Sequence, residues 1–201
     1  MSRQPQNAAA SEVGAYLSGR HQALLIVGWL GFPLAAFFLW FAVGLAAFLR
    51  RTSAQDDGLP TYALIAAAFT AAAAWVGSAL TTSLVFAPIS PGALSFVWGL
   101  QALMNVVLLG IPAAVFIFAC AHSMRRHGSA PAWLVWLGYV TAAGQAFATF
   151  GLFYPTGFTL DSAVAAGVLP AALLVLWVGS ASVYLIVASG GNERAGAVSP
   201  A

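Results

Sequence analysis

Residues 23–51, ALLIVGWLGFPLAAFFLWFAVGLAAFLRR, decide the fold class of this 201-residue chain. The stretch holds no charged residue from Ala23 to Leu49 and ends on the pair Arg50 and Arg51. Because the hydrocarbon core of a bilayer is about 30 Å thick, a spanning helix needs roughly 20 apolar residues. The stretch exceeds that length, so it predicts a membrane-spanning helix that ends at a positively charged boundary.

The composition of the whole chain agrees with this prediction. Hydrophobic residues make up 61% of it and charged residues only 6%, with a mean hydropathy of +0.90. A soluble domain has about 25% charged residues, which cover its core with polar surface. The deficit excludes a soluble enzyme, a nucleic-acid-binding protein and a disordered chain. We therefore attribute the pI of about 9.0 to membrane orientation, since the net charge is only +2.

Four more uncharged stretches are long enough to span a bilayer, and every charged residue lies outside the five. Continuously apolar runs favour helices over barrel strands, which are shorter and alternate in polarity. The predicted fold is an all-α integral membrane bundle of five transmembrane helices. The spans are predicted at about 23–49, 61–87, 93–121, 132–154 and 162–189.

The arginines predict the orientation of the bundle. Five spans place Arg3 and Arg20 on one face of the membrane, and the face rich in basic residues is normally cytoplasmic. The N-terminus is therefore predicted outside and the C-terminus in the cytoplasm. A chain without lysine but rich in alanine and glycine suggests a bacterial origin and hence the plasma (inner) membrane. The arginines of the cytoplasmic face are Arg50, Arg51, Arg125, Arg126 and Arg194.

The segments outside the spans are predicted to be tails. Residues 1–22 form an N-terminal tail, in which residues 11–20 are either a short interfacial helix or an irregular segment. Residues 190–201 are predicted to be disordered.

A Gly-x-Pro pattern recurs in the odd-numbered spans, at Gly31–Pro33 and Gly110–Pro112, with a longer spacing at Gly167–Pro170. It is explained either by tandem helical hairpins, as in parallel-repeat transporters, or by the ordinary use of glycine and proline in membrane helices. We favour the second explanation. Tryptophans inside the spans are expected to fill packing space or to face acyl chains, and they are Trp29, Trp40, Trp75 and Trp177.

No ionisable residue lies inside a predicted span, which argues against a proton pump, an ion-coupled transporter and a voltage sensor. Cys120 and His122 are too few for a zinc site, so no metal, cofactor or catalytic set is predicted. The neutral polar residues of the outer half are the candidate ligand-binding residues: Ser78, Thr81, Gln101, Asn105, Gln145 and Thr149.

Two interpretations of these residues stay open. Gln101 and Asn105 share one helix face, as do Gln145 and Thr149, and the two faces lie at similar depths in antiparallel spans. If the faces meet, the amides satisfy one another and hold the helices together, which is the common use of such groups and the one we favour. The alternative is an outward-facing pocket for a lipid or another hydrophobic molecule.

The segment Arg125–Gly138, RRHGSAPAWLVWLG, resembles a recurring segment of uncharacterised actinobacterial multi-pass membrane proteins. In those proteins an arginine-containing turn is followed by proline, an aromatic pair and glycine, although Ala132 stands where a basic residue is often found. The resemblance implies a plasma-membrane helical bundle and transfers no catalytic residue. The matching positions are Pro131, Trp133, Leu134, Trp136, Leu137 and Gly138.

The function that we favour is therefore non-enzymatic, although an enzyme stays among the alternatives. The first hypothesis is a membrane protein that binds or moves a lipid or small hydrophobic molecule. The second is an accessory or scaffolding subunit of a larger membrane complex, and the third is an intramembrane enzyme. The expected partners are membrane lipids together with a hydrophobic ligand or a membrane protein, and nucleic acid is not expected.

Overall fold

The computed structural model describes residues 17, 19–52, 57–86, 90–104, 108–150 and 169–197. Over these ranges the chain forms helices and contains no strand, as the sequence predicts. The helices are α2 (His21–Thr52), α3 (Leu59–Phe86), α4 (Pro91–Leu103), α5 (Leu109–His127), α6 (Ala132–Phe150) and α8 (Leu169–Ala197).

Three of the helices are long and apolar enough to cross a membrane: α2, α3 and residues Leu169–Ala188 of α8. They correspond to the first, second and fifth predicted spans. The fourth predicted span contains α6, and its last residues, 151–154, lie outside the described part of the chain. Residues 162–168, the predicted start of the fifth span, also lie outside it.

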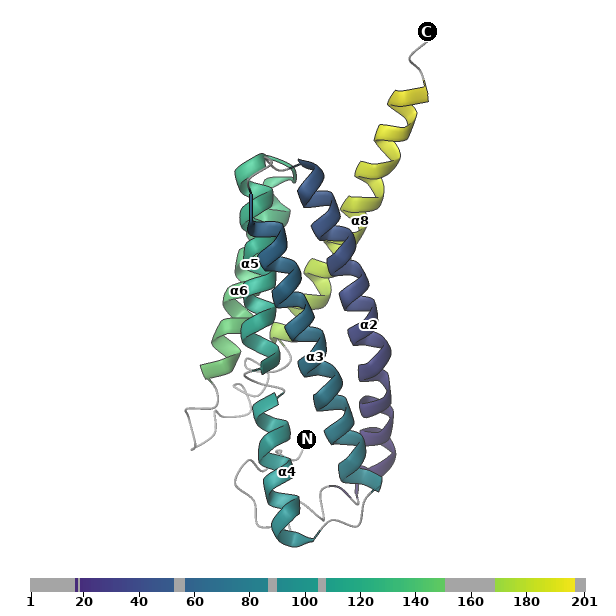
Figure 1. Ribbon diagram of the computed structural model, residues 1–201, viewed down its shortest axis with the longest axis vertical. Coiled ribbons are helices and arrows are strands. Elements are labelled where there is room, and N and C mark those ends of the chain that lie inside the picture. Colours follow the sequence, from purple (N-terminus) through teal and green to yellow (C-terminus); the bar gives the residue numbers. More distant parts are fainter. Residues whose placement is uncertain are drawn as a thin grey trace.

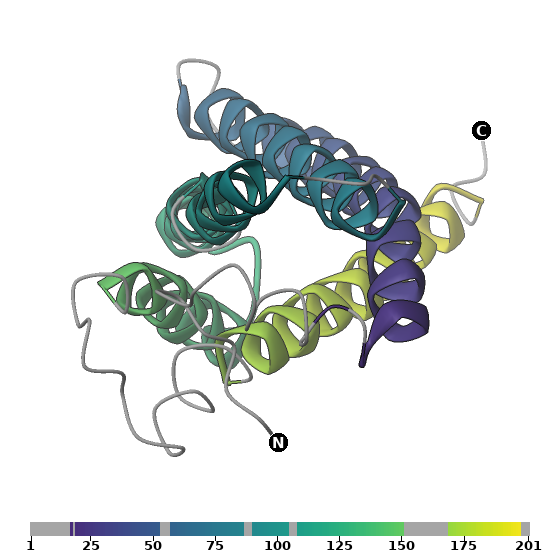
Figure 2. The same cartoon turned by 90° about the horizontal axis from the view of Figure 1, so that it is seen from below.

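Apart from α4 and α5, which run in the same direction, successive helices run in opposite directions along the bundle (Figure 1). The chain ascends in α2, descends in α3, ascends through α4 and α5, descends in α6 and ascends again in α8. Seen from below, the helices follow one another around the bundle in chain order, and α8 returns to the side of α2 (Figure 2). Each helix therefore packs mainly on its neighbours in the sequence.

The third predicted span, 93–121, contains most of α4 and the first part of α5, and residues 105–107 between them lie outside the described part. Met104 and Leu108 adopt π-helical backbone there. Pro112 has no N–H to offer the carbonyl of Leu108, and the helix adjusts at the residue whose hydrogen bond is lost.

The ends of the chain differ from the prediction where they are described. Residues 190–197 continue α8, although the sequence predicts disorder from residue 190. Once a helix is nucleated, each added residue forms one more backbone hydrogen bond, so two glycines do not end it. Residues 1–16 of the predicted N-terminal tail lie outside the described part. Arg20 N–H donates to Leu17 O over 3.2 Å, one turn before α2.

The core draws on α2, α3, α5, α6 and α8, and an aromatic cluster joins α2, α5 and α8 within it. Phe116 and Trp177 are fully buried, and their ring centroids are 6.0 Å apart in an edge-to-face arrangement. Phe38 lies 5.3 Å from Phe116, and Phe41 lies 6.2 Å from Trp177, both also edge to face. In an edge-to-face pair the positive edge of one ring meets the negative face of the other, which is attractive. This aromatic cluster therefore fixes the relative positions of the three helices.

Small residues bring α2 and α3 together. A Cβ on Gly28 would lie 2.6 Å from Thr82 Oγ1, and one on Gly31 would overlap Ser78 Oγ. Alanines of α3 are buried along the same interface, among them Ala63 and Ala67 at 0% exposure. Close backbone approach through small side chains is the usual way in which helices pack in lipid.

The tryptophans take both expected roles. Trp177 is 0% exposed and fills the core, whereas Trp29 and Trp40 are 68% and 78% exposed on the outside of α2. Trp75 is 38% exposed, and its Nε1 donates to Phe32 O over 3.1 Å, so it also ties α3 to α2 next to Pro33.

Candidate functional site

Five of the six predicted ligand-binding residues are described by the structure, and they fall into two groups in different parts of the bundle. The first group joins α3 to α4. Gln101 Nε2 donates to Thr81 Oγ1 over 2.7 Å, and the Thr81 hydroxyl donates to Gly77 O over 2.8 Å. Both side chains are only 7% exposed. Gln101 Oε1 is also buried and has no hydrogen-bond partner among the described residues.

Ser78 belongs to this first group by position but contacts another helix. It is 9% exposed and lies against the Cα of Gly31 in α2. Its small size allows α2 and α3 to approach, so its role is in packing.

The second group joins α6 to α5 and α8. Gln145 Nε2 donates to Pro170 O over 2.9 Å, at the first turn of α8. The Thr149 hydroxyl donates to Ala146 O over 2.6 Å, and its methyl group lies 2.8 Å from the place of a Cβ on Gly110. The polar atoms of this group are therefore used for contacts between helices or within α6.

Gln101 and Gln145 do not pair with each other in the described contacts. Gln101 Nε2 donates to Thr81 Oγ1, and Gln145 Nε2 donates to Pro170 O. Asn105 lies outside the described residues. The described contacts of the polar residues fit the interpretation that they hold helices together.

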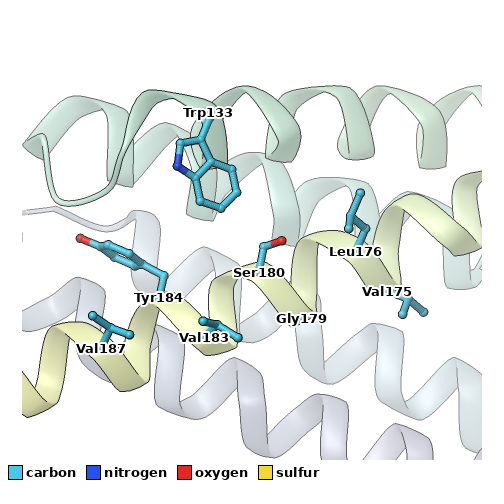
Figure 3. A pocket seen from close by; sticks show the side chains of 8 residues that line it. All are labelled: Trp133, Val175, Leu176, Gly179, Ser180, Val183, Tyr184 and Val187. Atoms are coloured by element: carbon cyan, nitrogen blue, oxygen red, sulfur yellow. The ribbon is translucent and has the colours of Figure 1, made fainter.

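A groove of about 650 Å³ lies elsewhere, between α8 and the first turn of α6 (Figure 3). Trp133 extends from α6 toward Ser180 and Tyr184 of α8. Among the described residues, no atom outside its own helix backbone lies within 4 Å of a Cβ built on Gly179, so this glycine leaves the groove open. The groove is lined by Trp133, Val175, Leu176, Gly179, Ser180, Val183, Tyr184 and Val187.

A hydrogen bond fixes one of the residues that line the groove. The Tyr184 hydroxyl donates to Ser129 O over 2.6 Å and ties α8 to the turn between α5 and α6. Phe48 of α2 packs on the other side of Tyr184, with centroids 6.2 Å apart, edge to face. These two contacts hold the Tyr184 ring in place at the groove's edge.

This groove is not predicted from the sequence. Trp133 is named there only as part of the segment that resembles other membrane proteins, and the α8 residues are not singled out. The available signal is the spacing Leu176–Ser180–Tyr184 with Val183 and Val187, which places one polar hydroxyl and several apolar groups on adjoining faces.

A polar contact closes the end of the bundle where α3 begins. Asp57 Oδ1 accepts the Leu59 N–H over 3.1 Å, and Asp57 Oδ2 lies 2.8 Å from His127 Nε2. Burial raises the pKa of the Asp57 carboxyl, but these hydrogen bonds and the charges of His127 and Arg126 outweigh it. The pKa of Asp57 is therefore held below its ordinary value. The contact links α3 to the last turn of α5.

A second cluster lies on the outer face of α5 and α6. The rings of Phe118 and His122 stack with centroids 5.7 Å apart, and His122 Nδ1 lies 3.3 Å from the Tyr139 hydroxyl. Trp136 packs on Tyr139 at 5.8 Å, and the Arg125 guanidinium lies 5.9 Å from the Trp136 ring centroid. We call these five residues the basic aromatic patch.

Within the described ranges, no three His, Cys, Asp or Glu side chains gather to hold a metal ion. The arrangement offers apolar surface, neutral hydrogen-bond donors and arginine charge at one end of the bundle. A comparison with protein-family models, curated proteins and solved structures finds no match to the chain.

Proposed function

We propose that the chain is a plasma-membrane protein that crosses the bilayer five times, with its N-terminus outside and its C-terminus in the cytoplasm. The alternating helix directions support this topology, since α4 and α5 together make one passage (Figure 1). α5 and α6 have 19 residues each, or about 28 Å of helix. That length approaches the thickness of a bilayer core.

We further propose that the protein binds a lipid or small hydrophobic molecule, or moves it, in the groove between α6 and α8. The single observation that carries this proposal is the groove itself. Its volume of about 650 Å³ lies within the range of about 300–1,000 Å³ that is typical of ligand pockets. Apolar side chains line most of it, while Trp133, Ser180 and Tyr184 add a few polar groups.

The shape of the groove suits an acyl chain. From Val175 to Val187 it follows α8 for about 18 Å. Trp133 lies in the first turn of α6, near the arginine-rich end, where a polar head would meet the interface. A lipid whose acyl chain lies along the valines would place its apolar part on apolar side chains. Its polar head would then lie near the polar groups of Trp133 and Tyr184.

The test uses the full chain in a mild detergent with a fatty acid that carries a diazirine in its chain. Illumination is expected to label the segment 175–187. Gly179→Leu fills the groove and displaces about two methylenes of the probe, so labelling should fall roughly tenfold. The matched control is Gly44→Leu, because Gly44 is also an exposed helical glycine with open space around its Cβ position in the described structure.

The control should label segment 175–187 like the wild type. Equal labelling of that segment in Gly179→Leu and in the wild type would contradict binding in the groove. Binding in the groove would also be contradicted if segment 175–187 were labelled no more strongly than the outer face of α2, where Trp29 and Trp40 are exposed to the surrounding lipid.

A second candidate is an accessory or scaffolding subunit of a larger membrane complex. α8 favours it, because this helix crosses the bundle obliquely and its C-terminal part stands clear of the other helices (Figures 1 and 2). On α8, Ile186 and Val187 are 72% and 70% exposed. A photoreactive amino acid in place of Ile186 distinguishes the two functions in native membranes. A discrete crosslinked protein supports the subunit, and adducts with lipid alone support the lipid binder.

A further inference from the structure

The last turn of α5 directs its basic side chains to two sides of the bundle. His127 turns inward and contacts Asp57 at 2.8 Å, where the carboxyl side chain is only 3% exposed. Arg126 adds its charge to the same carboxyl. Arg125 turns outward, is exposed, and lies over Trp136. The Asp57 carboxylate is thus paired inside the bundle, while the Arg125 charge faces the surroundings.

The outward side carries more than one polar group. His122 precedes Arg125 by three residues, so the two side chains lie on one face of α5. The Tyr139 hydroxyl of α6 lies 3.3 Å from His122 Nδ1. Stacking on Phe118 orients the imidazole, and contact with Trp136 orients the guanidinium. Donors from two helices therefore converge on one exposed place, held by aromatic rings.

An apolar strip leads away from the patch toward the middle of the bundle. On α5 it consists of Ile111, Val115 and Phe118, which are 48%, 48% and 51% exposed and follow a helical spacing. On α6 it continues in Val140 and Phe147, at 54% and 56%. The patch thus forms the polar end of a long apolar surface.

We propose that the basic aromatic patch binds the phosphate of an anionic phospholipid, whose acyl chains lie along this strip. A guanidinium matches phosphate oxygens with two parallel hydrogen bonds, and tyrosine and histidine can donate further ones. Arg125 lies near the end of α5, one turn before Gly128, at the depth where a headgroup sits if α5 spans the membrane.

Charge complementarity selects this occupant. A zwitterionic headgroup brings a cation that Arg125 repels, whereas an anionic one brings net negative charge to an arginine whose neighbouring carboxylate is already paired with His127. The inference rests on the proposed membrane topology. It is independent of the groove between α6 and α8, which takes only Trp133 from α6 and is otherwise lined by α8 residues.

The test is native mass spectrometry of the full chain in a mild detergent, titrated with phosphatidylglycerol or phosphatidylcholine of the same acyl chains. The wild type is expected to prefer phosphatidylglycerol. Arg125→Gln should weaken phosphatidylglycerol binding about tenfold, because a charge-assisted hydrogen-bonding group is lost. Tyr139→Phe, which removes only a hydroxyl, should weaken it by a smaller factor. Phosphatidylcholine binding should not change in either variant.

The matched control is Arg51→Gln, an exposed arginine at the same end of the bundle. It removes the general surface attraction of one arginine, which is worth about fivefold or less. Equal losses in Arg125→Gln and Arg51→Gln would overturn the proposal, and so would equal loss of both lipids. Gly179→Leu should keep the preference for phosphatidylglycerol, so failure of the groove proposal and failure of this one give different results. If free glycerol phosphate displaced bound phosphatidylglycerol as well as added phosphatidylglycerol does, the acyl chains would contribute nothing, and the role of the strip would be overturned.

Discussion

Gly138 marks the closest approach of α6 to the core of the bundle. A Cβ at this position would lie 2.8 Å from Trp177 Nε1 and 2.8 Å from the Ala121 Cβ. Trp177 is fully buried and held between Phe41 and Phe116, so it has little room to move. The glycine is thus required by the large ring on its neighbour helix.

We expect Gly138→Ala to destabilise the protein by about 1–3 kcal/mol, the usual cost of overpacking. Gly44→Ala is the control, since the described neighbours leave its Cβ position open and alanine favours a helix by up to about 1 kcal/mol. The two substitutions should move the melting temperature in detergent in opposite directions. A melting temperature for Gly138→Ala at or above that of the wild type would contradict the close packing at Trp177.

The two buried glutamines should differ in their contribution to stability. Gln145→Leu removes the hydrogen bond between α6 and α8 and is expected to cost about 1 kcal/mol. Gln101→Leu removes a bond to Thr81, but it also removes the buried Oε1, which has no partner among the described residues, and Thr81 keeps its bond to Gly77. It should be nearly neutral.

Melting temperatures of the two variants in detergent check this difference. If Gln145→Leu folds normally and loses a bound lipid instead, the predicted pocket of the outer half regains support. If Gln101→Leu lowers the melting temperature more than Gln145→Leu does, Gln101 Oε1 has a hydrogen-bond partner outside the described residues.

At the scale of the elements, Asp57 holds the start of α3 against the end of α5. Its pKa is lowered from the ordinary 3.8. The folded state therefore binds this proton less readily than the unfolded state does. The stability that Asp57 contributes is present above pH about 4 and is lost as the pH falls through its folded pKa.

We expect the melting temperature of the wild type to fall between pH 5 and pH 3, and Asp57→Asn to flatten that fall. Asparagine still accepts the Leu59 N–H but carries no charge for His127. Asp57→Ala, which loses both contacts, should be less stable than Asp57→Asn at neutral pH. Identical pH profiles for the wild type and Asp57→Asn would contradict the role of this pair.

The sequence predicts the helices well because hydrophobic length and charge placement are local properties. Arg50 and Arg51 indicate where α2 ends, and Pro60 indicates where α3 begins. Both helices lie within a few residues of the predicted spans. The π-helical backbone at Met104 and Leu108 is not predicted. Pro112, which leaves the Leu108 carbonyl without a donor, is visible in the sequence, but it does not determine how the helix adjusts.

The candidate site is predicted only in part. Gln101 and Thr81 are singled out from their polarity and depth, and they do meet, yet the partner of Gln145 is a backbone carbonyl that no side-chain pattern reveals. The groove depends on the path of α8 past Trp133, and the patch on the register between α5 and α6. Both are properties of helix packing, which periodicity within one helix does not determine.

At the scale of the whole molecule, the proposed topology of five passages puts the two ends of the bundle on opposite sides of the membrane. The turn after α2 and the start of α4 then face different compartments, and both offer an exposed residue, Thr52 and Ser90. The chain has one cysteine, Cys120, which is fully buried. A Cys120→Ala background therefore allows single engineered cysteines to be labelled without interference.

In that background we expect Ser90→Cys to react with a membrane-impermeant maleimide in intact cells, and Thr52→Cys to react only after lysis. The opposite pattern would reverse the orientation, and labelling of both in intact cells would contradict the alternating passages. Labelling of both in detergent is the control that each thiol is accessible.

The buried Cys120 also has a kinetic consequence. It lies at 0% exposure in the core with Phe116 and Trp177, so a thiol reagent reaches it only when the helices around it separate. When closing is fast compared with the chemical reaction, the rate of modification measures the fraction of open molecules and hence the free energy of opening. The rate at which a thiol reagent modifies Cys120 in the wild-type chain can therefore be used to measure helix opening inside a bilayer, where heat and denaturant are difficult to apply.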